Sequence, residues 1–257
     1  MKVSDIDEAI RQARASRLKL PPGAITGLEM EQAYSLGLKA FTREKPGAIK
    51  LGGTNKRTRA LFNVSRPYFG SLFASEVFES GAKLLPGNFV SPSVEPEIVV
   101  AFNRPLRATS KPRDTGVLLA SLDWVAIGLE VPDTVLTDPP TDGVAALLAD
   151  RCAAGALVVG ERQNAAVLDE LERAPAKLEF NAETVSQREP ECDLIGGVLG
   201  AVRDALSVLG EYECSVPAGV IIATGGLAPA IPLRECTCVT ARLGESSVSF
   251  EVSGREK

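Results

Sequence analysis

The hydrophobic pattern divides the chain into a short helical part followed by a longer part made mainly of strands. Ile6, Ile10 and Ala13 recur at the spacing of one helical face, and this pattern ends before Pro21. Proline lacks the amide hydrogen that a helix interior needs, so the first predicted helix stops ahead of it.

A second helix is predicted shortly after the first. Thr26 and Glu29 have the spacing of a capping box, which marks a helix start. Met30, Ala33 and Tyr34 then begin an apolar run with helical spacing. We therefore predict two helices at the N-terminal end of the chain, which together form a small helical cap.

The sequence pattern changes near residue 48, after which short apolar runs alternate with Gly, Pro and Asn. We predict a helical cap over residues 1–47 and a β-rich catalytic domain over residues 48–257. The predicted strands are Ala48–Leu51, Ile98–Phe102, Trp124–Val131, Ala156–Val159, Val220–Thr224, Thr237–Leu243 and Val248–Val252. The last two strands flank a Gly-Glu pair and predict a hairpin.

Only two further helices are predicted among these strands, over Asp142–Ala153 and over Asp193–Leu209. A sheet of parallel strands needs a helical crossover after almost every strand. Two helices are too few for that arrangement. The pattern therefore predicts a largely antiparallel sheet in an α+β fold.

Composition excludes several kinds of chemistry. The 257 residues include no histidine, which rules out Ser-His-Asp and Cys-His catalysis, histidine-ligated zinc and imidazole as a general base. The formal net charge is -5 and no basic stripe occurs, so we expect no nucleic-acid partner. No apolar run reaches the ~20 residues that cross a bilayer, so we expect no membrane contact and a cytoplasmic location. The five cysteines show no C-x-x-C spacing, and we expect all of them to be reduced.

Three glutamates form a candidate metal site. Glu95 and Glu97 stand two apart at the entry to a predicted strand, so their side chains project to the same side. Glu130 ends the next long apolar run. Oxygen ligands without His or Cys select a hard cation such as Mg²⁺ or Mn²⁺. The alternative is a solvated strand edge, which the E-x-E pattern alone does not exclude.

Five segments carry a family resemblance. Ala48–Thr54, Pro67–Phe73 and Val94–Ile98 resemble the KVGLT, P-x-FG-x-LF and xExEI motifs of the 2-keto-4-pentenoate hydratase and 4-oxalocrotonate decarboxylase family. That family belongs to the fumarylacetoacetate hydrolase superfamily. Ala149–Gly160 and Ile221–Pro229 resemble its ADNAS-x-G…V-x-G and IILTGALGP motifs. Each motif is weak alone, but their common order makes the resemblance specific.

The resemblance implies a mixed, rolled β-sandwich of the fumarylacetoacetate hydrolase type with a small N-terminal helical part, and a homo-oligomer. It implies Mg²⁺ or Mn²⁺ on the three carboxylates. It also implies that Lys50 is the active-site lysine, where its charge would stabilise an enolate. Outside the resemblance, Lys50 would be a surface lysine on an edge strand. From the same motifs the residues expected to bind substrate are Phe69, Leu72, Arg151, Thr224 and Gly225.

The chain departs from the family at two places. Asp150-Arg151-Cys152-Ala153 stands where the family has Asp-Asn-Ala-Ser, and no GHP motif follows Asp193. These changes remove groups that would orient water. We hypothesise that Arg151 binds a second carboxylate of an unusual substrate, because guanidinium binds carboxylates bidentately. The alternative is that Arg151 is solvated at a helix end.

The resemblance implies a divalent-metal-dependent lyase, either a hydratase or a decarboxylase, acting on a small 2-oxo or 2-hydroxydienoic acid through a metal-bound enolate. Decarboxylation depends less on an oriented water, so the missing hydroxyl favours it slightly. One alternative is a C-C hydrolase of β-dicarbonyl acids, although such enzymes commonly use a histidine dyad. Another is a catalytically degenerate, non-enzymatic subunit that supports a partner enzyme.

Overall fold

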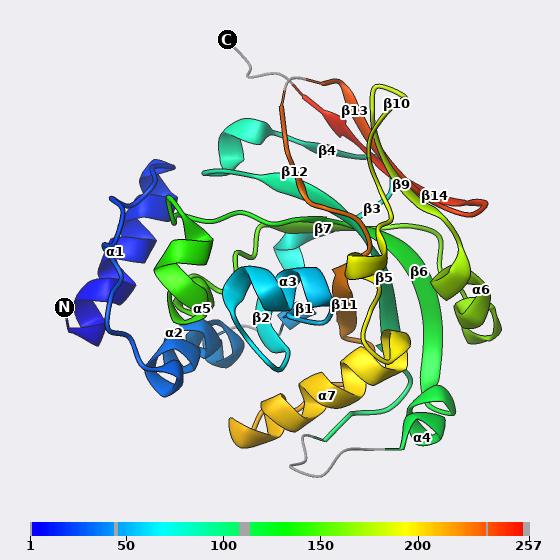
Figure 1. Cartoon of the computed structure of the whole chain (residues 1–257), viewed down its shortest axis with the longest axis horizontal. Helices are drawn as coiled ribbons and strands as arrows, with labels where there is room; N and C mark the ends of the chain where they lie inside the picture. The colour runs from blue at the N-terminus through cyan, green and yellow to red at the C-terminus, as the bar shows by residue number, and fades with distance from the viewer. Residues whose placement is uncertain (1, 44–45, 108–113, 235, 254–257) are drawn as a thin grey trace.

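The computed structural model describes residues 2–43, 46–107, 114–234 and 236–253 and contains two β-sheets, with most of the longer helices at the left of and below the larger sheet (Figure 1). The helices are α1 (Val3–Ser16), α2 (Met30–Arg43), α3 (Lys56–Phe62), α4 (Thr115–Leu119), α5 (Pro139–Ala149), α6 (Leu168–Arg173) and α7 (Gly197–Glu211), with short 3₁₀ turns η1 (Ala74–Glu76), η2 (Pro86–Asn88), η3 (Ala165–Val167) and η4 (Pro190–Cys192). The strands are β1 (Pro46–Gly52), β2 (Tyr68–Phe73), β3 (Val77–Glu79), β4 (Ala82–Leu84), β5 (Ser93–Phe102), β6 (Leu122–Val131), β7 (Ala156–Val159), β8 (Gln163–Asn164), β9 (Ala176–Phe180), β10 (Glu183–Gln187), β11 (Ile221–Gly226), β12 (Ile231–Pro232), β13 (Cys238–Leu243) and β14 (Ser246–Val252).

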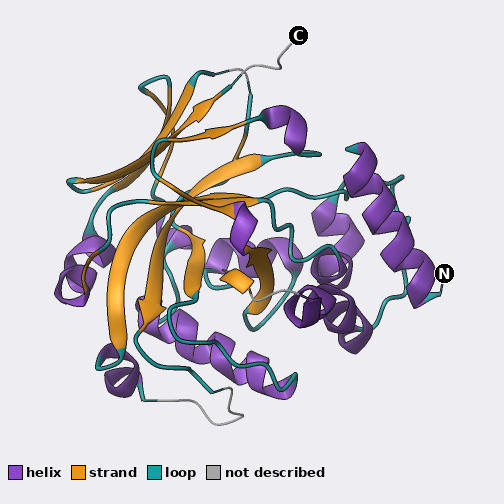
Figure 2. Cartoon of the chain, turned by 180° about the vertical axis from the view of Figure 1, so that it is seen from behind, coloured by secondary structure: helices purple, strands orange, loops and turns teal. Residues whose placement is uncertain are grey.

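The larger sheet is mixed and curled. Its strands run in the order β2-β1-β11-β5-β6-β7-β3, with β12 beside β5 and β8 beside β6. Along that path only the β1–β11 and β7–β3 pairs are parallel. The two long strands β5 and β6 bend strongly and give the sheet the shape of a half-barrel (Figure 2). The predicted fold class, a mixed rolled β-sandwich with a largely antiparallel sheet, is confirmed.

The smaller sheet has the order β10-β9-β13-β14-β4 and packs against β6 through β13 and β14. The predicted hairpin is present, since Leu243 pairs with Ser246 across the turn. The hairpin of β9 and β10 was not predicted. Its turn is formed by Asn181 and Ala182, both at positive φ, which is the backbone of a type I′ turn.

The two predicted N-terminal helices are present as α1 and α2. The start of α2 differs from the capping box expected at Thr26, because the side chain of Gln32 accepts a hydrogen bond from the amide of Glu29 at 3.2 Å. Arg14 on α1 donates to Asp150 at 2.6 Å and so fixes α1 to the end of α5. The apolar faces of both helices join the main core, and the division of the chain at residue 47 stays a prediction.

The later predicted helices are present with different ends. α5 stops at Ala149, four residues before the predicted end, because Arg151, Cys152 and Ala153 all have positive φ values of 52°, 60° and 56°. Left-handed backbone cannot continue a right-handed helix. α7 begins only at Gly197, since Gly196 has a φ of 75°.

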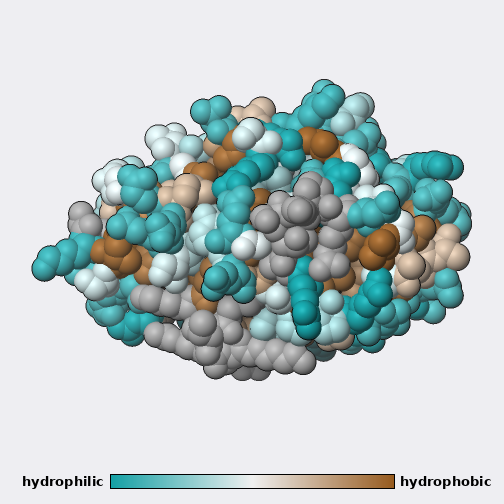
Figure 3. Space-filling view, turned by 90° about the horizontal axis from the view of Figure 1, so that it is seen from below, coloured by the Kyte–Doolittle hydropathy of each residue, from teal (hydrophilic) through white to brown (hydrophobic). Residues whose placement is uncertain are grey.

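The surface carries both hydrophilic and apolar residues. The visible part of the face seen from below is mainly hydrophilic, with small separate apolar spots (Figure 3). In the described part of the chain, every helix is too short or too polar to cross a membrane. The five cysteines are free thiols, as predicted.

Candidate metal and substrate site

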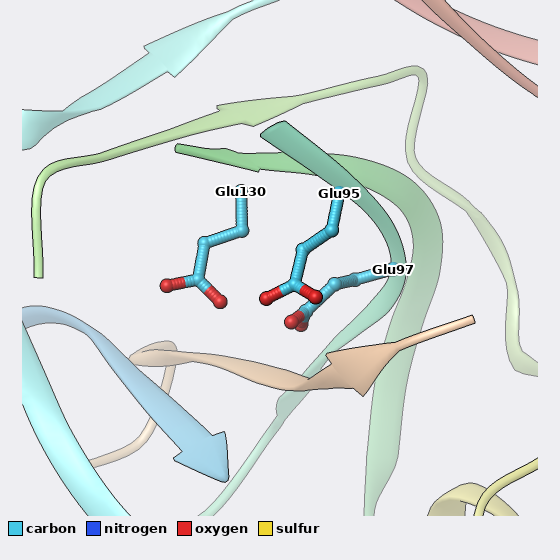
Figure 4. A group of neighbouring side chains, drawn as sticks. All are labelled: Glu95, Glu97 and Glu130. Carbon is cyan, nitrogen blue, oxygen red and sulfur yellow. The ribbon is translucent and has the colours of Figure 1, made fainter. Parts of the chain in front are cut away.

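Two adjacent strands bring the three predicted glutamates together. In the antiparallel pairing of β5 with β6, Glu95 lies directly opposite Glu130, and Glu97 follows Glu95 on the same side of β5. One carboxylate oxygen from each residue lies within 4.8 Å of the others. The three side chains point into the concave side of the curled sheet (Figure 4). The convergence expected from the E-x-E spacing is therefore present.

The carboxylates are electrostatically crowded. Burial raises the pKa of Glu95 to about 7, and the charge of Glu130 acts in the same direction. Burial, followed by the charges of Glu130 and Glu95, raises the pKa of Glu97 well above its ordinary value. Like charges held this closely in a buried site are favourable only with a proton or a cation between them.

Lys50 faces the carboxylates from the other side of the cavity. It lies on β1, is 5% exposed, and its ammonium group contacts the carboxylate of Glu130. Burial is the largest single effect and lowers the pKa of Lys50, but the charge and hydrogen bond of Glu130 together with the charge of Glu95 raise the pKa above its ordinary value. Lys50 is thus a buried cation within the site, and not a lysine on an exposed strand edge.

A glycine pair on β11 makes room for the carboxylates. The amide of Gly225 donates to Glu97 at 3.0 Å. A Cβ atom on Gly226 would lie 2.1 Å from a carboxylate oxygen of Glu95, and one on Gly225 would lie 2.0 Å from the hydroxyl oxygen of Thr54. Gly225 also has a φ of 116°, which side chains rarely allow. Only glycine fits at both positions without moving the site.

The site has the properties of a binding site for a hard divalent cation. The ligands are three carboxylates, which suit Mg²⁺ or Mn²⁺. One oxygen of Glu97 is buried and has no hydrogen-bond partner, although a buried polar atom normally has one. A cation would satisfy this oxygen and remove the repulsion among the three charges. The residues present therefore fit such an ion.

A cavity of about 230 Å³ opens over the carboxylates. Lys50, Glu95, Glu130 and Gly225 line it. A cavity of this size holds a small organic acid and excludes larger molecules.

Three of the residues predicted to bind substrate do not line this cavity. Phe69 is 2% exposed and stacks on Tyr34 with ring centroids 4.9 Å apart. Leu72 is fully buried in a second core cluster, and the hydroxyl of Thr224 donates to the carbonyl of Ile98 at 2.7 Å. Of the five residues predicted to bind substrate, only Gly225 lines the cavity.

Arg151 is also outside the cavity lining, so the structure gives no support to the hypothesis that it binds a substrate carboxylate, which stays a prediction. Its guanidinium donates two hydrogen bonds, of 2.9 and 2.8 Å, to the carboxylate of Glu76 and lies 4.7 Å from the ring centre of Phe73. It is therefore not solvated either. The pair anchors the left-handed turn from which Cys152 and Ala153 line the cavity.

Three polar residues of the cavity were not assigned from the sequence. The hydroxyl of Thr54 is buried, lines the cavity and has no hydrogen-bond partner. Tyr68 lines the cavity, and burial raises the pKa of its phenol well above the ordinary value. Asn55 caps α3 by accepting from the amide of Thr58 at 2.8 Å and donates to the carbonyl of Gly226 at 3.0 Å. The cap at Asn55 was the one local signal available, because Asn before a helix marks its start.

Comparison with known proteins finds similar lyases. The chain is 28% identical over 255 residues to 2-hydroxyhexa-2,4-dienoate hydratase of Comamonas testosteroni. The alignment covers 95% of this chain and 94% of that protein. The predicted family resemblance is confirmed. Over 202 residues the chain is 26% identical to 4-oxalocrotonate decarboxylase of Pseudomonas sp. strain CF600, covering 78% of this chain and 75% of that protein. No family model matches the chain.

Solved structures agree on the fold. The 4-oxalocrotonate decarboxylase from Pseudomonas putida G7, complexed with magnesium and adipate, superposes with a TM-score of 0.86 at 23% identity, covering 98% of this chain and 97% of the other. A fumarylacetoacetate hydrolase family protein from Yersinia pestis CO92 superposes with a TM-score of 0.60 at 14% identity over 80% of this chain and 92% of the other. The chain thus has the fold of the fumarylacetoacetate hydrolase superfamily.

Proposed function

We propose that this chain is a divalent-metal-dependent lyase, a hydratase or decarboxylase, that acts on a small 2-oxo or 2-hydroxydienoic acid. The observation that carries the proposal is the triad of Glu95, Glu97 and Glu130, with Lys50 against Glu130, at a small cavity that Lys50, Glu95 and Glu130 line. The homologous hydratase and decarboxylase support the same reaction class.

The protein groups have separate roles in this proposal. Glu95, Glu97 and Glu130 would hold Mg²⁺ or Mn²⁺, and when bound the cation would supply a Lewis acid that polarises a carbonyl group. Lys50 places a fixed positive charge beside the site, where it stabilises negative charge that develops on the substrate oxygen. The buried position of Lys50 makes this interaction stronger than it would be in water.

The chain has no histidine, so the hydroxyl groups of the cavity are candidates to orient water. Thr54 offers an unpartnered hydroxyl inside the cavity, and Tyr68 offers a phenol with a raised pKa. A phenol that stays protonated at neutral pH can donate a hydrogen bond to an oxygen of the substrate or of water. These two residues are the candidates to replace the missing Asn and Ser of the family motif.

The other candidate functions have less support. A C-C hydrolase of the kind with a histidine dyad has no counterpart here, because histidine is absent. A degenerate subunit would not be expected to keep four ionisable groups in one buried cluster. We keep as predictions a cytoplasmic location, a homo-oligomer, no nucleic-acid or membrane partner, and Mg²⁺ or Mn²⁺ as the physiological ion.

The test is a spectrophotometric assay of the purified chain with 2-hydroxydienoates and 2-oxo diacids, with and without Mn²⁺. We expect loss of the dienol absorbance only when the ion is present. Product analysis then separates hydration from decarboxylation. The proposal is wrong if no compound of either class reacts and the chain does not bind Mn²⁺ in calorimetry.

A further inference from the structure

A second cavity, larger than the metal cavity, lies between the ends of α1, β12 and β14 and the turn η2. Its volume is about 1100 Å³, compared with about 230 Å³ for the metal cavity. An organic molecule of ordinary ligand size fits in such a volume. We call this cavity the groove, and its lining includes Arg17, Phe89, Val90, Leu233, Arg234 and Val252.

Two arginines give the groove a positive charge. Among the residues that the structure describes, neither guanidinium pairs with a carboxylate. Arg17 donates to the side-chain oxygen of Asn88 at 3.4 Å, and Arg234 lies 6.0 Å from the ring centre of Phe180. No described residue of the lining is acidic. In a chain with a formal net charge of -5, two cations are thus left without a counter-charge beside one cavity.

The walls of the groove are apolar. Phe89, Val90, Leu233 and Val252 are partly buried and pack against the main core, which holds them in place. A simple inorganic anion at the arginines would leave these walls in water. A ligand with an aromatic or hydrocarbon body would cover them, and burial of apolar surface favours binding.

The groove and the metal cavity share one segment of chain. Val90 and Pro92 line the groove, whereas Ser91, Ser93 and Glu95 line the metal cavity. Successive side chains therefore face the two cavities in turn. A ligand in the groove contacts the reverse side of the segment that carries the metal ligand Glu95.

Hydrogen bonds hold this segment at two points. The amides of Val90 and Ser91 both donate to the carboxylate of Asp133, at 2.9 and 2.7 Å. The amide of Leu233 donates to the carbonyl of Pro92 at 2.9 Å. A ligand that packs on Val90 and Leu233 at once therefore restricts the chain just before Glu95.

We propose that the groove is an effector site for an organic anion with an aromatic or hydrocarbon body, and that its occupation tightens ion binding at the three carboxylates. The anionic group binds Arg17 and Arg234, since guanidinium binds oxyanions strongly. The body packs on the apolar walls. Ordering the segment before Glu95 in advance removes an entropy cost that the ion would otherwise meet, so the two ligands favour each other. This inference goes beyond the proposed function and holds for any reaction at the metal site.

The probe is 8-anilinonaphthalene-1-sulfonate, an aromatic sulfonate whose fluorescence rises at apolar surfaces. Titrated into the Mg²⁺-loaded chain, it should saturate one site. The double variant Arg17→Gln, Arg234→Gln should bind it about tenfold more weakly. Arg104→Gln is the matched control, because Arg104 is exposed, lies outside the groove and donates to the carbonyl of Val117 at 3.1 Å. It should leave the affinity for the dye unchanged.

Two results of this titration would overturn the inference. Equal dye affinity in the double variant would mean that the dye binds elsewhere. A change in the oligomer mass of the double variant in light scattering would mean that a second copy of the chain, and not a small anion, occupies the groove.

Calorimetry of Mg²⁺ binding with and without saturating dye measures the coupling between the two sites. We expect the ion to bind about fivefold more tightly when the dye is present. An unchanged or weaker ion affinity would overturn the inference and leave the proposed function intact. Absence of ion binding under both conditions would overturn the proposed function together with the coupling.

Two valines distinguish coupling from simple binding. Val90 and Val252 both line the groove and are partly buried, but only Val90 belongs to the segment before Glu95. Val90→Ala and Val252→Ala should each weaken dye binding about threefold, because each removes apolar contact. At saturating dye the fivefold gain in ion affinity should persist in Val252→Ala and fall below about twofold in Val90→Ala. An equal gain in both variants would contradict the inference.

Discussion

The ammonium group of Lys50 contacts the carboxylate of Glu130 although two strands, β11 and β5, lie between the strands that carry them. In a flat sheet three strand spacings of ~4.8 Å would separate the two backbones by ~14 Å. Two extended side chains bridge that span with difficulty. The curl of β5 and β6 shortens it, so the site depends on the half-barrel shape of the sheet (Figure 2).

Replacing Lys50 tests whether ion binding and catalytic activity depend on different residues. In Lys50→Met the three carboxylates remain and a repelling positive charge is removed, so we expect Mn²⁺ to bind at least as tightly as before. Activity should fall by a factor of about 10³, because the fixed charge beside the substrate oxygen is lost. Calorimetry and turnover on one preparation check both expectations. Loss of ion binding together with activity would mean that Lys50 is needed for the shape of the site.

Glu97→Gln is predicted to weaken ion binding and to stabilise the metal-free chain. A neutral amide keeps the shape of Glu97 but removes a buried charge beside Glu95 and Glu130. Ion affinity should fall about 100-fold, while the metal-free chain should gain about 1 kcal/mol of unfolding free energy. Thermal unfolding with and without Mn²⁺ measures both effects.

The matched control for that experiment is Glu183→Gln on β10, an exposed glutamate outside the site. It should change neither ion affinity nor unfolding temperature by a measurable amount. If Glu97→Gln left the metal-free chain less stable than this control, the crowding of the carboxylates would not be a source of instability.

Ion binding should weaken as pH falls. In the metal-free chain the pKa of Glu95 is raised to about 7, and that of Glu97 is raised well above its ordinary value, so both hold protons to higher pH than an ordinary glutamate. An ion must displace these protons, and its affinity should drop about tenfold for each proton displaced per pH unit. Calorimetry in buffers with different ionisation enthalpies counts the protons released.

The same pKa shifts fix the sign of the stability change. A pKa raised on folding means that the folded chain binds more protons than the unfolded chain, so the stabilising contribution is present at low pH and is lost as pH rises through 7. We expect the metal-free chain to become less stable between about pH 5 and pH 8 from this source. Saturating Mn²⁺ should abolish that loss. A metal-free chain whose stability rises over this window would contradict the assignment.

Arg151 is expected to stabilise the fold and not to recognise a charged group of the substrate. Its two hydrogen bonds to Glu76 are partly buried and hold the turn that carries Cys152 and Ala153. Arg151→Ala should cost about 2 kcal/mol of unfolding free energy and lower activity on mono- and dicarboxylates by the same factor. Glu76→Gln and the double variant complete a thermodynamic cycle. A loss confined to dicarboxylates would instead place Arg151 at the substrate.

The sequence predicted the charged part of the site well because its signals are local. The E-x-E spacing of Glu95 and Glu97 fixes a common side of a strand whatever the partner strand is. Glu130 was named because it ends the next long apolar run, and Lys50 entered through a family motif; the structure places both beside the first two.

The apolar walls could not be predicted in the same way. Motif membership did not show that Phe69, Leu72 and Thr224 point into the core, because the direction of a strand side chain depends on strand register, which is set by distant residues. α3 has seven residues and escaped detection, since helical periodicity needs a longer window. That helix carries Leu61 and Phe62 at the cavity mouth.

Gly226 is predicted to be indispensable for ion binding for a purely steric reason. Its φ lies outside the left-handed region, so alanine is compatible with the backbone, but the new Cβ would lie 2.1 Å from a carboxylate oxygen of Glu95. The carboxylate must move away, and with it one of the three ligands. We expect Gly226→Ala to weaken Mn²⁺ binding about 100-fold while the chain still folds.

Gly116→Ala on α4 is the comparison for that variant. A Cβ at Gly116 would lie 3.0 Å from a carboxylate oxygen of Asp114, far from the metal site, and its backbone is also compatible with alanine. Ion binding by Gly116→Ala should equal that of the unmodified chain. If Gly226→Ala also bound Mn²⁺ normally, Glu95 could not be a ligand in the position seen here, and the ion would have to be held by Glu97 and Glu130 alone.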